Sequence, residues 1–142
     1  MLRSILTLLI GFSLTTGFAQ DATDWTPYFS NEELSITVRY EDCHYPEKGV
    51  DNRYLFLKLE NLTNQTITVN YNLDRSYNGK ELNPDIKLFE FSIPANSLIN
   101  GQCTDLINGL HLFSRMLKMK EKSTLSHFEL SNLVINGKNV AR

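Results

Sequence analysis

The alternation of apolar and polar side chains is the feature that most constrains the fold of this chain. Apolar residues occupy every second position in residues 34–40, and the same alternation returns in residues 53–60 and 67–73. A strand places successive side chains on opposite faces, so a period of two predicts β-strands that each turn one apolar face to a core. We predict that the second and third strands form a hairpin around the short turn 61–65.

The rest of the chain continues this pattern with one exception. Residues 86–93 and 125–137 predict further strands, and residues 97–103 predict a short one. Residues 109–122 instead place apolar side chains three or four positions apart, which predicts a short amphipathic helix. The fold class is therefore all-β: a single antiparallel, Ig-like sandwich with one short helix near the C-terminal end. The predicted core contains Leu55, Leu57, Leu59, Val69, Tyr71, Phe89 and Phe91.

The N-terminus has the three parts of a secretory signal peptide. Arg3 is followed by a mostly apolar run over residues 5–14, and residues 17–19 form a small-x-small cleavage pattern. The apolar run is shorter than the roughly 20 residues that span a membrane. We therefore expect a signal peptide at residues 1–19, a leader at 20–33 and the sandwich domain at 34–142. The mature chain is expected to be periplasmic or secreted, with no transmembrane segment.

The chain has two cysteines, Cys43 and Cys103, and both follow the expected cleavage site. An even number of cysteines in an oxidising compartment predicts a disulfide. If the thiols stayed reduced, Cys43 and Cys103 could instead bind a soft metal together with His44 and His111. A reactive Cys43 activated by the adjacent His44 is disfavoured, because neighbours in an extended chain point to opposite faces.

Charge and motifs give little support for an enzyme or a nucleic-acid-binding protein. The formal net charge is −2, and no stretch forms the basic stripe that would neutralise nucleic-acid phosphates. The chain has no G-x-S-x-G, H-E-x-x-H, P-loop or G-x-G-x-x-G motif. We therefore predict no cofactor and no catalytic residues, and a non-enzymatic role is favoured.

One loop resembles a calcium-binding pattern. Asp74, Ser76, Asn78 and Asp85 stand at the first, third, fifth and twelfth positions of a twelve-residue segment, with Gly79 at the sixth. The flanking segments are predicted strands, however, whereas an EF-hand needs helices. An ordinary Asn-Gly turn accounts for the same residues. Calcium binding by this loop is left open.

Two groups of aromatic residues are candidate binding elements. The leader carries Trp25, Tyr28 and Phe29, and the second face of the predicted sheet carries Tyr54 and Phe56. The leader could pack its rings over the sandwich edge, and either the predicted helix or the leader could cover that second face. If nothing covers the second face, it is an interaction surface, because large exposed apolar patches mark binding sites.

Three segments carry a family resemblance: YLFLKLENLTNQTITVNYNLD, SIPANSLINGQC and HFELSNLVI. Together they resemble small exported β-sandwich proteins of Gram-negative bacteria, Ig-like in build and mostly uncharacterised. The resemblance implies the fold and the compartment and supplies no site residues. We expect an exported, non-enzymatic binding or accessory module whose partner is another exported or envelope protein. The alternative is a small periplasmic hydrolase or thiol/redox protein with a site assembled from distant residues, such as Cys43 and His111.

Overall fold

Strands make up almost all of the regular structure. The computed structural model describes residues 24–82, 87–119 and 123–140, and the predicted signal peptide lies outside these ranges. The strands are β1 (Thr26–Ser30), β2 (Leu34–Tyr45), β3 (Val50–Asn61), β4 (Ile67–Tyr77), β5 (Lys80–Glu81), β6 (Leu88–Ile93), β7 (Leu98–Asn100), β8 (His111–Met116), β9 (Leu125–Ile135) and β10 (Lys138–Asn139). A 3₁₀ turn, η1 (Pro46–Lys48), joins β2 to β3. In the described ranges no helix is long and apolar enough to cross a membrane.

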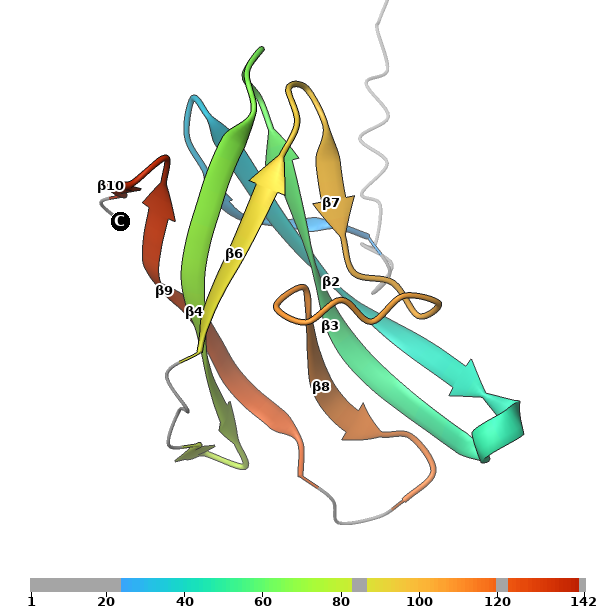
Figure 1. Cartoon of the computed structure of the whole chain (residues 1–142). Helices are drawn as coiled ribbons and strands as arrows, with labels where there is room; N and C mark the ends of the chain where they lie inside the picture. Colours follow the sequence, from blue (N-terminus) through green and yellow to red (C-terminus); the bar gives the residue numbers. More distant parts are fainter. Residues whose placement is uncertain (1–23, 83–86, 120–122, 141–142) are drawn as a thin grey trace, which may run out of the picture.

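The strands form two curled antiparallel sheets that face each other (Figure 1). In the first sheet the order is β1-β2-β3, and both β7 and β8 pair with the other side of β3. In the second sheet the order is β10-β9-β4, and both β5 and β6 pair with β4. The all-β, antiparallel prediction is confirmed. β1 lies within the segment predicted as a leader and pairs with β2 as an edge strand.

The main core lies between the facing surfaces of β3 and β4. Leu55, Leu57 and Leu59 of β3 and Val69 and Tyr71 of β4 are all fully buried, as predicted. The side chains of Phe89 and Phe91, also predicted for the core, are half-buried and pack at its margin. Burying a large apolar side chain stabilises the fold by about 1.5–3 kcal/mol, so these inward faces hold the two sheets together.

The predicted hairpin of β3 and β4 is wrong, because the two strands belong to different sheets. The chain crosses between sheets at a turn that the buried side chain of Asn61 organises. Its Nδ2 lies 2.7–3.0 Å from the carbonyl oxygens of Gln65, Ile93 and Pro94, and its Oδ1 accepts a hydrogen bond from the backbone N–H of Thr63. The alternating pattern cannot separate the two arrangements, because a strand has one apolar face both when it pairs with the next strand in one sheet and when it packs against that strand across the core.

The helix predicted over residues 109–122 is also wrong. Residues 111–116 of this segment form strand β8, and residues 120–122 lie outside the described residues. Leu112 points into the main core, whereas Phe113 packs against a second cluster on the outer face of the first sheet. Because both faces of β8 carry apolar side chains, the hydrophobic period of two is lost and the apolar spacing resembles that of a helix. Pairing with β3 supplies backbone hydrogen bonds that override the weak helical pattern.

β7 and β8 are two parts of one edge strand that the loop 101–110 interrupts. The Gly101 N–H donates to the Leu57 carbonyl at 3.1 Å, and the Leu57 N–H donates to the Leu110 carbonyl at 2.9 Å. The loop therefore leaves the first sheet and returns to it at the same residue of β3. Figure 1 shows this loop crossing in front of the gap between the sheets. Only the first part of the strand predicted for residues 97–103 exists, as β7.

The predicted disulfide is present and ties this loop to the outer face of the first sheet. Cys43 of β2 is bonded to Cys103 of the loop, with their Cα atoms 5.4 Å apart. The Tyr45 hydroxyl donates a hydrogen bond of 2.8 Å to the Cys103 carbonyl. Beneath the disulfide, Tyr54 and Phe56 are buried with Cys43 in a small second core. This outer face is therefore covered.

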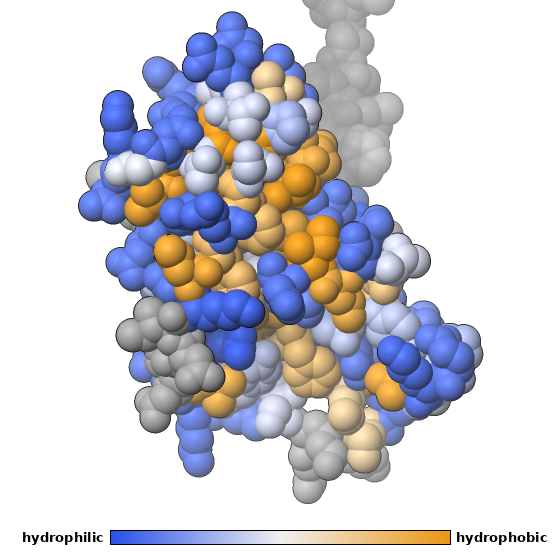
Figure 2. All heavy atoms as spheres, viewed as in Figure 1, coloured by the Kyte–Doolittle hydropathy of each residue, from blue (hydrophilic) through white to orange (hydrophobic). Residues whose placement is uncertain are grey.

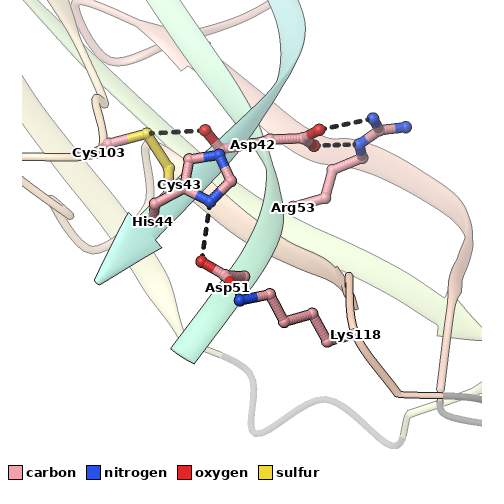
Figure 3. Close-up of polar contacts among 7 residues, drawn as sticks. All are labelled: Asp42, Cys43, His44, Asp51, Arg53, Cys103 and Lys118. Atoms are coloured by element: carbon pink, nitrogen blue, oxygen red, sulfur yellow. Dashed lines mark hydrogen bonds and ion pairs between the residues drawn. A yellow bond between two sulfur atoms is a disulfide. The ribbon is translucent and has the colours of Figure 1, made fainter. Parts of the chain in front are cut away.

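β2 and β3 extend as a two-stranded ribbon through the charged residues 41–52, where η1 forms the turn between them. Opposite charges face each other across this ribbon (Figure 3). Arg53 forms a two-pronged ion pair with Asp42, at 2.5 and 3.0 Å, and Asp51 pairs with both His44 and Lys118. Hydrogen bonds from Arg53 lower the pKa of the Asp42 carboxyl, and hydrogen bonds from Lys118 and His44 lower the pKa of Asp51.

Candidate functional site

A cleft of about 470 Å³ opens between β4 of the second sheet and β8 of the first. We call it the open-edge cleft. Its floor is apolar: Leu73 and Leu112 are nearly buried, and the half-buried Phe89 completes the base. Small-molecule sites in proteins occupy roughly 300–1,000 Å³ and combine an apolar lining with a few polar groups. The volume of this cleft lies within that range, and Leu73, Leu112 and Phe89 give it an apolar base within a largely polar lining.

The wall of the cleft at residues 108–110 is held from several directions. The buried Tyr71 hydroxyl donates a 2.7 Å hydrogen bond to the Gly109 carbonyl, and burial raises the pKa of Tyr71 well above its ordinary value. Gly109 has a φ of 90°, and a Cβ placed there would lie 2.6 Å from the Phe89 ring. Only glycine lets the backbone approach the ring this closely in that conformation. The wall is thus built into the fold.

Two further hydrogen bonds fix the β8 side of the cleft. The Tyr77 hydroxyl donates to the Phe113 carbonyl at 2.7 Å, and the two rings stack with their centroids 6.5 Å apart. The Nδ1 atom of His111 lies 2.8 Å from the Ile107 carbonyl. Nδ1 therefore carries the proton in neutral His111, so that Nε2 is left as a hydrogen-bond acceptor.

Polar groups with unused hydrogen-bonding capacity surround the apolar floor. The side chains of Arg75, Asn108 and Ser123 line the cleft and are exposed. Within the described part of the chain, none of the three makes a side-chain hydrogen bond or ion pair. Among the described lining residues there is no aspartate or glutamate, although the chain as a whole carries a net charge of −2.

The sequence patterns do not single out this cleft, although β4 contains one signal of it. Leu73, Arg75 and Tyr77 stand at alternate positions, so a cation occupies an inward-facing register. A charged residue at such a position is compatible with folding where the sandwich opens to water. The other wall, at residues 108–110, depends on long-range contacts with β3 and β4 that no local pattern reveals.

Trp25, the only tryptophan of the chain and a predicted binding residue, is used within the fold. Its ring packs against the second core on the outer face of the first sheet. The Arg39 guanidinium lies 4.5 Å from the ring centroid and the Lys58 ammonium lies 4.7 Å from it. Such cation–π contacts contribute about 0.5–1 kcal/mol at exposed sites. Trp25 thus helps to cover the face that carries Tyr54 and Phe56.

The other two aromatic residues of the leader also contact the body of the protein. Tyr28 stacks on Phe128 with a centroid distance of 5.4 Å, and its hydroxyl oxygen accepts a hydrogen bond from the Leu130 N–H. Phe29 packs against the main core. The five predicted binding residues therefore do not meet in one open site: Trp25 joins Tyr54 and Phe56, while Tyr28 and Phe29 contact the main core.

Exposed apolar side chains lie instead on the face that carries β6, β7 and the loop 101–110. Leu88 is 54 % exposed, Leu98 is 49 % exposed and Leu106 is 36 % exposed. Figure 2 shows apolar surface running down the middle of this face, bordered by hydrophilic residues. The structure shows no occupant for this surface, and the open-edge cleft is the more defined candidate site.

The two cysteines considered for thiol or metal chemistry are bonded to each other. The disulfide takes both sulfur atoms, so Cys43 offers no thiol to His111 and no thiolate to a metal. The His44–Asp51 pair has the geometry of a base and its orienting carboxylate. Within the described residues no hydroxyl hydrogen-bonds to His44, so this pair lacks a neighbouring nucleophile.

The calcium pattern falls mostly on a strand. Asp74 and Ser76 lie in β4, and Asn78 and Gly79 form the left-handed turn into β5. The Oδ1 of Asn78 accepts a hydrogen bond from the Thr124 N–H. The twelfth position, Asp85, lies outside the described residues, and among the described ones no group of three or more His, Cys, Asp or Glu could hold a metal ion. The described part is an Asn-Gly turn.

Comparison of the chain with protein-family models, curated proteins and solved structures finds no match. The candidate function therefore has to come from the geometry of the open-edge cleft.

Proposed function

We propose that this chain is an exported, non-enzymatic binding module of Ig-like build that holds a small ligand in the open-edge cleft. The observation that carries the proposal is the combination of an apolar floor at Leu73 and Leu112 with a rim of polar side chains that have no partner among the described residues. The wall at Gly109 is fixed by the buried Tyr71 hydroxyl, so a ligand would meet a largely preformed site. Preorganisation lowers the entropic cost of binding.

Export is supported by the disulfide and by the signal-like N-terminus. Disulfides persist in the periplasm and outside the cell and are rare in the reducing cytosol. The Cys43–Cys103 bond also holds the loop that provides one wall of the cleft, so an oxidising compartment would favour the competent site. The Ig-like build is supported by two antiparallel sheets that pack face to face, with the chain crossing from β3 to β4.

The proposal can be tested with N-phenyl-1-naphthylamine, a neutral apolar dye that fluoresces when it leaves water. A substitution at the rim, Leu82→Asp, places a carboxylate beside the floor of the cleft. The matched control is Leu98→Asp on β7, outside the cleft. The two leucines are 47 % and 49 % exposed, so neither change should unfold the protein.

We expect the wild-type protein and Leu98→Asp to bind the dye with equal affinity, and Leu82→Asp to bind it at least fivefold more weakly. Loss of apolar contact and the desolvation of a new carboxylate both oppose binding. Absence of dye binding to the wild-type protein would contradict the proposal. Equal effects of the two substitutions would also contradict it, because the dye would then bind to the surface of β6 and β7.

A further inference from the structure

We infer that the ligand of the open-edge cleft is a small anionic amphiphile, with an apolar body on the floor and an acid group at Arg75. This inference rests on the proposed function and adds the chemical class of the ligand. It concerns a free small molecule with a carboxylate, sulfonate or similar head group. The site would hold such a molecule by two physically different contacts, one apolar and one ionic.

The charges around the cleft favour an anion. Arg75 lines it, and no aspartate or glutamate does so within the described residues. Arg75 also lines a neighbouring hollow with Asp74, Glu81 and Glu129, and within the described residues it forms no ion pair with any of these carboxylates. Asp74 also lies opposite Glu129 of β9. Arg75 thus lines the cleft without an ion-pair partner among the described residues, on a chain that is acidic overall.

The position of Arg75 suits it to bind the head group while the floor binds the body of the ligand. Arg75 follows Leu73 on the same face of β4 and precedes Tyr77 there. Burial raises the pKa of Tyr77, and the positive charge of Arg75 opposes that rise. A guanidinium offers five N–H donors in a planar fork that matches the geometry of a carboxylate or sulfonate.

Other polar groups could complete the contact with an acid group. The Asn108 amide and the Ser123 hydroxyl are donors without an intramolecular partner in the described residues. Hydrogen bonds to a charged group are roughly twice as strong as those between neutral groups. A neutral ligand of the same shape would gain the apolar contact but not this one.

Two dyes of almost the same shape separate the ionic contact from the apolar one. 8-Anilino-1-naphthalenesulfonate is N-phenyl-1-naphthylamine with an added sulfonate group. Each dye is titrated into the full mature chain and into the Arg75→Gln variant. The control is Lys138→Gln, which removes one positive charge from β10, outside the cleft. The titrations are repeated at low and high salt.

We expect Arg75→Gln to weaken binding of the sulfonate dye about tenfold and to leave binding of the neutral dye within twofold. Lys138→Gln should change neither affinity. Added salt should weaken sulfonate binding to the wild-type protein and have less effect on Arg75→Gln, because ions screen the contact that this variant lacks. The result would be a selective loss of anion affinity.

The outcomes that would overturn the inference are distinguishable. If neither dye binds, the proposed function is wrong and this inference falls with it. If both dyes bind and Arg75→Gln weakens them equally or not at all, the cleft is a binding site but the preference for an anion is wrong. Binding to anionic vesicles without binding of the free sulfonate dye would also overturn the inference, since the site would then recognise a membrane surface.

Discussion

Replacing Tyr71 by Phe removes one hydroxyl and tests whether the cleft wall is held from within the core. The Tyr71 side chain is fully buried and its hydroxyl donates to the Gly109 carbonyl at 2.7 Å. Phenylalanine keeps the ring and leaves that buried carbonyl without this partner. An unsatisfied buried polar group costs about 1–3 kcal/mol, so we expect a loss of stability of this size.

Tyr77→Phe is the matched control, because Tyr77 makes the same kind of bond to the Phe113 carbonyl at 2.7 Å. Tyr77 is only half-buried and lines the cleft, so water can replace its hydroxyl. We expect a smaller cost of about 0.5–1 kcal/mol. Urea unfolding measures both values: the midpoint should fall while the slope of stability against urea stays unchanged.

The two variants should also differ in their effect on the cleft. Tyr71→Phe loosens the wall at Gly109 and should weaken binding of the neutral dye, whereas the smaller change at Tyr77 should affect binding less. If the Tyr71 variant lost no more stability than the Tyr77 variant, the wall would not depend on the buried hydrogen bond. That result would refute the reasoning on which a preformed cleft rests.

Three further changes probe the loop and the ribbon. Gly109→Ala should destabilise the fold by about 2–4 kcal/mol in urea unfolding, because the added Cβ causes both backbone strain and a steric clash. The control is Gly137→Ala, where φ is 76° and no heavy atom lies within 4 Å of the added Cβ; it should cost only the strain, about 1–2 kcal/mol. Breaking the disulfide by Cys103→Ser should lower stability by at most about 4 kcal/mol, since the bond closes a loop with a sequence separation of 60, and should weaken dye binding. The Arg53 contact lowers the pKa of Asp42 in the folded state, so the ion pair stabilises the protein above about pH 4 and this stabilisation is lost as the pH falls further. In Asp42→Asn the thermal midpoint should therefore decrease less over that pH range than in the wild-type protein.

The alternation of side chains predicts the strands well and their pairing poorly. The inward positions of β3 and β4, such as Leu57 and Val69, are buried as the pattern requires. The same pattern cannot distinguish two strands that pair within one sheet from two that stack across the core. That choice depends on long-range contacts, here the full-length pairing of β2 with β3 and the turn organised by Asn61.

The false helix and the missed cleft have a common physical origin in the split edge strand. β8 carries the buried Leu112 on one face and the half-buried Phe113 on the other, so the hydrophobic period of two is lost. The loop before it is fixed by hydrogen bonds to Leu57 and Tyr71, both of which are distant along the chain. The disulfide was predictable because two cysteines allow a single pairing. The cleft was not, because its walls come from both sheets.

The most direct test of the central claim is a methyl NMR titration of the mature chain with 8-anilino-1-naphthalenesulfonate. Leu73 and Leu112 form the floor of the open-edge cleft, whereas Leu34 is also buried but does not line it. A bound naphthalene ring shifts the methyl signals of the side chains that it contacts. The cleft account predicts saturable shifts at Leu73 and Leu112 and none at Leu34. Saturable binding that leaves both floor residues unshifted would contradict it.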